Sequence, residues 1–485
     1  MNKKKMIITI ILAILILFGI YMLYNTFAIS TIVINDSNNI YDVKVGEGTS
    51  INVGKGSNKT IYFHIENVNK GSIKYGVGYN TNTNIEVLVY DDSVDKAIDV
   101  IGYGENKFIK LYLNNPTDSD STVTISTVLG YENGGDLIIP DGITLVTEVY
   151  TPSVTLADYI TNLYTNASKT KAQNNGIEYN YASSESLMND RLGGTTTSLD
   201  GGNIRYYGAS PNNYIYFNCS DYNNQSDTTC EKWRIIGVFD GKVKIIRNES
   251  IGKYSWDSSA SGVNSGQGEN EWPQADLMKL LNPGYDSETI GGSLYYNSKS
   301  GTCYKGKTNA TTSCDFTTTG IKNNITRRKI AEVTWNLGGW NSSSIYSNQI
   351  YGYERGKKVY SGRSTTWPGK VALPYPSDYG YATDFNKCTQ NLYKYNSSTD
   401  SYACRSNDWM YPIITNSGAS FGWFLTPNSG FASLAWNVDS SGSVYYSVYG
   451  TVFSARGVAP VLYLSSEQVI ESGGDGSISN PYKLG

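Results

Sequence analysis

The sequence predicts an N-terminal transmembrane helix, then an all-β sandwich, then an α+β domain. Three observations predict this order. An uncharged apolar run follows a cluster of lysines at the N-terminus, and short alternating strand patterns fill the chain up to residue 150. Strand and helix patterns mix in the remainder, which contains all six cysteines. The 485 residues are enough for two or three domains.

The apolar run is Met6–Leu23, and it directly follows Lys3–Lys5. A helix rises about 1.5 Å per residue, so this run is long enough to cross the hydrocarbon core of a bilayer. The lysines place its N-terminus in the cytoplasm. A cleaved signal peptide, with Thr26–Ala28 as the cleavage site, is the alternative. Both interpretations export the chain, and we expect residues 1–28 to be a signal anchor of a single-pass cell-membrane protein whose C-terminal part is extracellular.

Residues 29–151 read as a series of short strands. Ile61, Phe63 and Ile65 alternate with polar neighbours, which is the period of two of a strand with one buried face. Similar alternation recurs along this part of the chain, with Asn, Gly, Pro and Asp turn signals between the runs. The pattern predicts an antiparallel sandwich of immunoglobulin-like type. The further predicted strands are Ile85–Tyr90, Phe108–Leu113, Val123–Val128 and Ile143–Val149.

Residues 152–203 are expected to form a helix and a linker. Leu156–Tyr164 has apolar residues at helical spacing, whereas residues 166–203 are polar with few apolar anchors. The α+β domain is then assigned to residues 204–485.

The α+β domain opens with a hairpin signal, in which two β-rich runs are joined by Asp240-Gly241. A helix is expected to begin at Trp272-Pro273 and to end before Asn282, and a second helix is expected over Lys322–Asn336. Residues 346–411 read as loop. The predicted strands of this domain are Trp233–Phe239, Lys242–Arg247, Gly422–Thr426, Leu434–Val438, Val444–Tyr449 and Val458–Leu464.

Several segments of this domain resemble an uncharacterised C-type-lectin-like domain family of exported proteins from low-GC Gram-positive gut bacteria. The segments are Trp233–Phe239, Trp335–Gly339, Ser377–Ala382, Gly457–Leu464 and the closing Asn480-Pro481-Tyr482. The family is similar to the Fibrobacter major paralogous domain and to the fold of formylglycine-generating (sulfatase-modifying) enzymes. An arginine is common where this chain has Ala459. The resemblance covers roughly residues 204–485 and implies a fold rather than a function.

The cysteines fall into three sequential pairs, each separated by a short polar stretch. Export permits disulfide bonds, and an even count leaves no odd thiol. Sequential pairing is therefore the prediction, with free thiols as the alternative. The predicted disulfide bonds are Cys219–Cys230, Cys303–Cys314 and Cys388–Cys404.

The residue types argue against several kinds of chemistry. The formal charge of −4 is spread thinly, so nucleic-acid binding is not expected. His64 is the only histidine, which leaves no Ser-His-Asp or Cys-His set for the second domain. The Gly418–Gly422 match to a nucleophile elbow lacks the required downstream histidine. No CxxC spacing suggests zinc, and Trp436–Asp439 only partly matches a calcium-lectin strand. We therefore predict no catalytic residue, metal or cofactor.

Aromatic and polar residues near the C-terminus are the candidate ligand contacts, because such side chains stack on sugar rings and anchor protein interfaces. The 41 tyrosines suit an adaptable binding surface, although an A/T-rich genome would also raise their number. The sequence thus predicts a non-catalytic surface protein that binds a glycan or a protein. A formylglycine-generating-type enzyme, using Cys388 or Cys404, and a structural cell-envelope subunit are the alternatives. The candidate contacts are Trp423, Trp436, Asn437, Asp439, Tyr445, Tyr446 and Tyr449.

Overall fold

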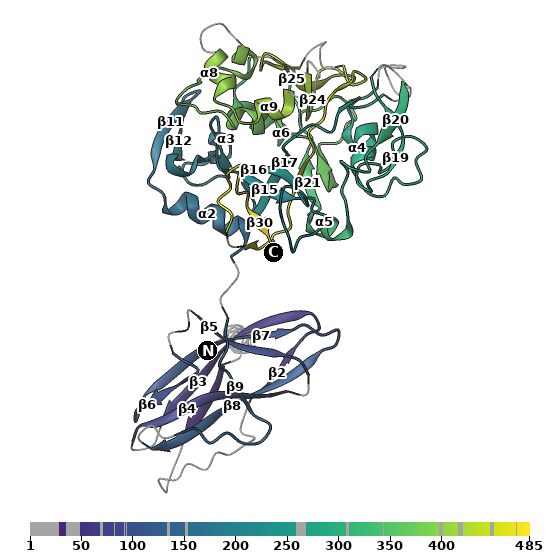
Figure 1. The fold of residues 1–485 in the computed structure, drawn as a ribbon. Helices are drawn as coiled ribbons and strands as arrows, with labels where there is room; N and C mark the ends of the chain where they lie inside the picture. The colour runs from purple at the N-terminus through teal and green to yellow at the C-terminus, as the bar shows by residue number, and fades with distance from the viewer. Residues whose placement is uncertain are drawn as a thin grey trace, which may run out of the picture. The chain divides into compact units, whose positions relative to one another are not determined.

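The computed structural model divides the chain into two compact units, Met1–Pro152 and Ser153–Gly485 (Figure 1). The predicted anchor, Met6–Leu23, lies outside the described residues. Among the residues that are described, no helix is both long enough and apolar enough to cross a membrane. The described residues are 29–34, 49–67, 71–81, 83–91, 93, 95–132, 136–150, 154–258, 268–306, 310–342, 344–396, 401–415, 421–446, 451–471 and 473–485.

The N-terminal unit consists of two five-stranded sheets. The first has the order β1 (Ile29–Ile34), β3 (Ser57–Asn67), β7 (Asn106–Asn115), β5 (Glu86–Tyr90) and β10 (Val149–Tyr150). The second contains β2 (Thr49–Val53), β8 (Ser121–Glu132), β4 (Ile73–Thr81) and β6 (Ile98–Ile101), with β9 (Thr144–Leu145) paired to β4.

One hydrophobic core lies between these two sheets, which makes the unit a two-layer β-sandwich. Ile61, Phe63 and Ile65 of β3 and Val123 and Ile125 of β8 are all buried in it. The alternation seen in the sequence therefore does mark the inward face of each strand. The run Ile143–Val149, predicted as one strand, instead contributes to two short strands. β9 pairs with β4 in one sheet, and β10 then pairs with β5 in the other sheet.

The C-terminal unit is built around a nine-stranded sheet. Its order is β11 (Thr170–Asn174), β12 (Ile177–Ala182), β13 (Leu187–Asn189), β14 (Ile204–Tyr206), β16 (Glu231–Phe239), β17 (Lys242–Arg247), β28 (Val461–Tyr463) and β23 (Val371–Ala372), with β15 (Tyr214–Phe217) also paired to β16. The predicted hairpin is confirmed as β16 and β17, which Asp240-Gly241 joins.

A second sheet of five strands lies in the same unit, in the order β18 (Lys253–Tyr254), β27 (Arg456–Gly457), β24 (Phe421–Pro427), β25 (Ala435–Asp439) and β26 (Val444–Tyr445). Three two-stranded ribbons complete the strands: β19 (Ser300–Tyr304) with β20 (Thr311–Asp315), β21 (Val333–Asn336) with β22 (Thr366–Gly369), and β29 (Ile470–Glu471) with β30 (Lys483–Leu484).

The helices of this unit are short. The described ones are α2 (Leu156–Asn166), α3 (Arg191–Gly194), α4 (Asp276–Leu281), α5 (Asn324–Lys329), α6 (Ser347–Glu354), α7 (Pro376–Tyr381), α8 (Ser401–Ser406) and α9 (Tyr411–Thr415). The predicted helix at Leu156 is confirmed, and Thr155 caps it by accepting a hydrogen bond from the amide of Asp158. At Trp272 a single 3₁₀ turn precedes α4.

The linker prediction for residues 166–203 is wrong. These residues form β11 to β13 at one end of the nine-stranded sheet. Tyr179 and Tyr181 of β12 are buried in one cluster with Tyr381 and Phe385. The polar residues misled the sequence interpretation because their backbone groups pair within the sheet, and tyrosine rather than aliphatic residues supplies the core.

Two further predictions in this domain are corrected. The helix expected over Lys322–Asn336 is only α5, after which the β-branched and aromatic residues of β21 pair with β22. Residues 346–411, expected to be loop, contain α6, α7 and α8, the strands β22 and β23, and the first residue of α9. These helices are each about two turns or less, too short to show a hydrophobic period.

All three predicted disulfide bonds are confirmed: Cys219–Cys230, Cys303–Cys314 and Cys388–Cys404. Each closes a loop on the second unit, and Cys303–Cys314 joins the two strands of one ribbon. The bonds therefore stabilise long connections that have few apolar residues of their own.

Gly237 lies where two paired strands of the C-terminal unit, β14 and β16, approach each other closely. It lies at a bulge in β16, where an added Cβ would be 2.1 Å from the carbonyl oxygen of Ile204 in β14. We predict that Gly237→Ala lowers the free energy of unfolding by about 2–3 kcal/mol or more, because backbone must move. Gly352→Ala in α6 is the control. Its Cβ would meet nothing within 4 Å, and alanine favours a helix by about 1 kcal/mol.

Denaturation followed by tryptophan fluorescence measures this effect, because all nine tryptophans lie in the C-terminal unit. Equal midpoints for the two glycine variants would contradict the predicted clash.

Candidate functional site

Three of the predicted ligand contacts are core residues. Trp423, Trp436 and Asn437 are fully buried in the five-stranded sheet. The indole nitrogens of the two tryptophans donate hydrogen bonds to the backbone carbonyls of Tyr254 and Trp340, at 3.0 and 3.1 Å. Such side chains cannot touch a ligand at the surface. Consecutive residues of β24 and β25 are buried, so both faces of these strands are covered.

The remaining predicted contacts lie on or beside β25 and β26. Asp439, Tyr445 and Tyr446 are partly exposed, whereas Tyr449 lies outside the described residues. The Asp439 carboxylate accepts hydrogen bonds from Ser441 and from the amide of Ser443, so it holds the turn between the two strands. Of the predicted ligand contacts, only Asp439, Tyr445 and Tyr446 are therefore described as partly exposed.

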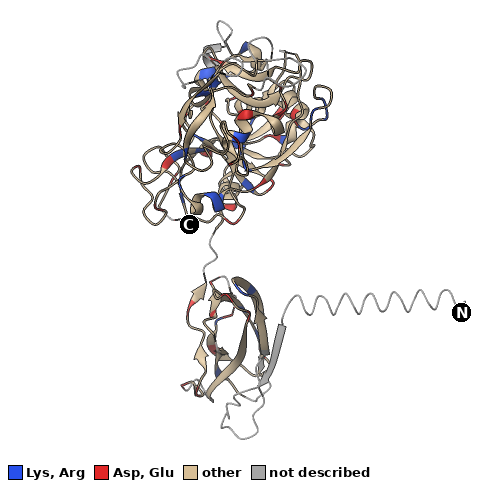
Figure 2. Cartoon of the chain, turned by 90° about the vertical axis from the view of Figure 1, so that its right-hand side faces the viewer, with Lys and Arg blue, Asp and Glu red and all other residues tan. Residues whose placement is uncertain are grey.

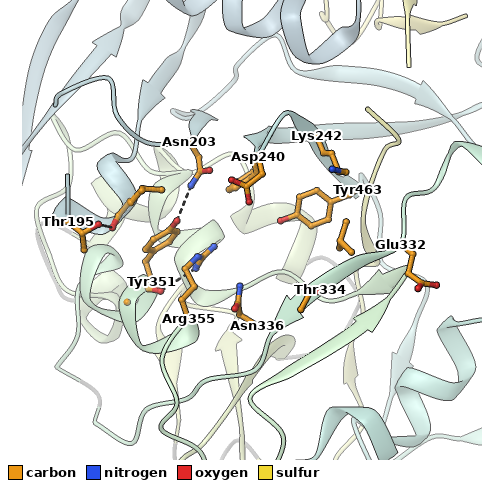
Figure 3. A pocket seen from close by; sticks show the side chains of 14 residues that line it. Thr195, Asn203, Asp240, Lys242, Glu332, Thr334, Asn336, Tyr351, Arg355 and Tyr463 are labelled. Carbon is orange, nitrogen blue, oxygen red and sulfur yellow. Dashed lines mark hydrogen bonds between the residues drawn. The ribbon is translucent and has the colours of Figure 1, made fainter. Parts of the chain in front are cut away.

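Two hollows lie elsewhere, around the β16–β17 turn, and Figure 3 shows one of them. One hollow of about 720 Å³ opens between this turn, β21 and the C-terminal half of α6. Its lining residues are Leu192, Thr195, Asn203, Phe239, Asp240, Lys242, Glu332, Val333, Thr334, Asn336, Tyr351, Gly352, Arg355 and Tyr463. We call it the main hollow.

Polar groups converge on the middle of the main hollow. In Figure 3 Asp240, Arg355, Asn336 and Tyr463 point into it from different elements. Two acidic and two basic side chains line it, because Glu332 and Lys242 join Asp240 and Arg355. The lining therefore offers hydrogen-bond donors and acceptors without a net charge.

Arg355 is held in place by its neighbours. Its guanidinium lies 3.5 Å above the centre of the Tyr351 ring, and Nη1 donates to Glu354 at 3.2 Å. The Tyr351 hydroxyl in turn accepts a hydrogen bond of 3.0 Å from Asn203. Stacking and hydrogen bonding together fix the plane of the guanidinium.

A buried ion network lies beneath the hollow. Asp378 accepts from Arg205 at 2.9 Å and from Lys244 at 2.5 Å, and Asp190 accepts from Arg205 at 2.6 Å. All four side chains are essentially unexposed. The network joins β14, β17, α7 and the residue before α3. Its Arg205–Asp378 bond connects residues that are 173 positions apart in sequence. It therefore fixes the base on which the hollow is built.

Aromatic rings surround the cationic members of the network. The Lys244 ammonium lies 4.5 Å from the Tyr375 ring centre, and Arg205 lies 4.5 Å from that of Phe239. Burial lowers the pKa of Lys244 to about 8, although Asp378 opposes the shift. Burial would raise the pKa of Asp378, but Lys244 and Arg205 outweigh it and the pKa falls. The carboxylate is thus held ionised between two cations.

Glu354 is the titratable group that connects the network with Arg355. It is fully buried and accepts hydrogen bonds from the Ser377 amide and hydroxyl, at 2.9 and 2.5 Å. Burial raises its pKa to about 7, although Arg355 and Ser377 oppose the shift. Its charge therefore changes near neutral pH, directly beside the wall of the main hollow.

Few features of the sequence point to this site. Asp240 is predicted only as a turn residue, and Arg355 lies in the range predicted to be loop. Asn203 fell in the region read as linker. The hollow combines segments that are distant in the chain, so no local spacing could reveal it. The signal that was present is the pair of segments Trp233–Phe239 and Trp335–Gly339, which flank the hollow.

The reactive thiol that an enzyme of the formylglycine-generating type would need is not free here, because Cys388 and Cys404 are joined. Over the described part of the chain, no group of three or more His, Cys, Asp or Glu side chains is arranged to hold a metal ion. Charged side chains of both signs are interspersed along the ribbon of both units (Figure 2).

No family model matches this chain, and no curated protein and no solved structure shows significant similarity to it.

Asp378→Asn tests the ion network. The change leaves Lys244 and Arg205 buried without their shared carboxylate, and breaking a buried pair in this way costs about 3–5 kcal/mol. We expect the free energy of unfolding of the C-terminal unit to fall by that amount, measured by tryptophan fluorescence in denaturant. Lys171→Gln is the control, since it breaks an exposed pair with Glu178 worth about 0–1 kcal/mol. Similar losses in the two variants would contradict this role of Asp378.

Glu354 predicts a pH dependence of stability. The folded chain keeps this proton up to pH about 7, whereas the unfolded chain loses it near pH 4.5. The folded state therefore binds more protons between these values, and stability falls as the pH rises through this window. The shift corresponds to roughly 3 kcal/mol. We expect the decline in unfolding free energy between pH 4.5 and 7 to be smaller in Glu354→Gln by up to that amount. An unchanged decline in the variant would exclude Glu354 as a source.

Proposed function

We propose that this chain is a non-catalytic, cell-surface binding protein whose main hollow receives a glycan. The single observation that supports this is the lining of the main hollow. It combines equal numbers of acidic and basic side chains with amides and a tyrosine hydroxyl, around apolar ring surface from Phe239 and Tyr463. A sugar presents hydroxyl groups that both donate and accept, together with apolar C–H faces, so it matches such a lining better than an ion does.

The proposal includes the finer fold and the location. The two-layer sandwich would be of immunoglobulin-like type, and the C-terminal unit would be C-type-lectin-like, as the sequence resemblance implies. The apolar run Met6–Leu23 would hold both units outside the cytoplasm. The three disulfide bonds support an oxidising location. Asp439, Tyr445 and Tyr446 remain a predicted second contact face.

A glycan array probed with the purified full chain tests the proposal. Arg355 is unsuitable for mutation because it packs on Tyr351, so two side chains without a described structural bond are used. We expect Lys242→Ala and Asn336→Ala each to weaken binding of an array hit by about tenfold, the effect of losing one or two hydrogen bonds. Titration calorimetry measures the dissociation constants.

Two substitutions outside the hollow are the matched controls. Lys253→Ala and Asn341→Ala remove exposed side chains of the same types that do not line it. They should bind as the unaltered chain does. Failure of every glycan on the array to bind a folded chain, or equal losses in the control variants, would overturn the proposal.

A further inference from the structure

A second hollow adjoins the main hollow. It also measures about 720 Å³, and it lies between the C-terminal end of α2, the segment Asp200–Ile204 and the β16–β17 turn. Leu192, Asn203 and Asp240 line both hollows. The two are therefore neighbouring compartments that share a dividing wall, which we call the ridge.

The backbone of the ridge is unusual. Arg191, Leu192, Gly193 and Gly194 have φ values of +50°, +49°, +71° and +85°, so α3 is a left-handed turn of four consecutive residues. Left-handed backbone is unfavourable for residues with a Cβ, and more than one such residue in a row is rare. Strained backbone persists only where its surroundings enforce it, and it is concentrated at functional sites.

Side chains on both flanks enforce this turn. The Asp190 carboxylate accepts from the Leu192 amide at 3.0 Å and from the Asn203 amide at 2.9 Å. Asn189 accepts from the amides of Arg191 and Gly202, at 3.0 and 2.8 Å. These bonds hold the backbone whatever side chain residue 192 carries.

The two glycines of the turn have a packing reason. A Cβ on Gly193 would be 2.9 Å from the Asn348 carbonyl oxygen, and one on Gly194 would be 2.9 Å from Ile177. Leu192 has the same left-handed backbone, which glycine would fit better. Its side chain lines both hollows, and 38% of its surface is exposed. An exposed leucine with left-handed backbone is strained, and strain of this kind is found most often where it serves a function.

We propose that Leu192 is a specificity-determining contact over which a linear oligosaccharide passes, with sugar units in both hollows. This inference rests on the proposed function and names the class of glycan. The leucine side chain supplies an apolar ridge for the C–H face of the ring that crosses it. Asn203 and Asp240, which border both hollows, lie where hydroxyl groups of that same ring would be.

A chain-length series tests the inference on the full chain. The probes are glucose, mannose, galactose and N-acetylglucosamine, each as linear chains of one to six units. For the sugar that binds, we expect affinity to rise by at least about tenfold between one unit and the chain that fills both hollows. Affinity that is constant from one unit to six overturns the inference, because a single hollow then suffices.

Leu192→Gly and Leu192→Asn test the ridge itself, since both residues tolerate left-handed backbone. We expect each variant to keep its Tm within about 4 °C of the unaltered chain and to lose most of the gain from chain length. Affinity for the single sugar should stay the same. Long chains that bind these variants as tightly as the unaltered chain would overturn the role of Leu192.

Ser186→Gly is the matched control. Ser186 also has a positive φ, of +52°, and it lines neither hollow. This variant should retain the full dependence on chain length. The outcomes separate the two proposals. Binding of single sugars without a length effect overturns only this inference, whereas no binding of any glycan, in this series or on the array, overturns the proposed function and this inference with it.

Discussion

The fold of the C-terminal unit depends on one carboxylate. Asp378, at the start of α7, is shared by Arg205 of β14 and Lys244 of β17, and Arg205 passes the contact on to Asp190. Burying four charges costs several kcal/mol per ion unless each finds partners. Here each does, and rings of Phe239 and Tyr375 lie against the two cations. These ion pairs form only when the four segments that carry them keep their present positions, so the network fixes how segments distant in sequence meet.

The two hollows are built on this network. Phe239, which lies against Arg205, also lines the main hollow, and Arg355 lies there beside Glu354, which bonds the residue before Asp378. The buried ion pairs therefore hold the side chains that line the main hollow in fixed positions. A binding site of pre-positioned polar groups loses less entropy when a ligand arrives. This explains why a unit rich in loops can still present a defined surface.

Short sequence patterns predicted the features that depend on interactions between residues close together in the chain. The alternation of Ile61, Phe63 and Ile65, the Asp240-Gly241 hairpin and the sequential cysteine pairs all follow from short-range rules, and each appears as expected. The linker prediction for residues 166–203 failed because buried tyrosines do not look like a core. The prediction that Trp423 and Trp436 contact a ligand was wrong because both side chains are buried. Residue type alone does not show whether a strand residue is exposed. The hollow itself comes from long-range contacts, which no local period encodes.

The second carboxylate of the ion network, Asp190, also shapes the ridge. One oxygen of Asp190 accepts from Arg205 and from the Asn203 side chain, while the other accepts from the Leu192 and Asn203 amides. The left-handed turn is therefore not an independent loop. If it moved, the buried Asp190 carboxylate would lose the hydrogen bond from the Leu192 amide. The backbone strain at Leu192 is offset by the hydrogen bond from its amide to the Asp190 carboxylate. Leaving this buried carboxylate short of a donor would cost more free energy than the strain does. In this way the interaction that organises the sheet also holds an exposed leucine between two hollows.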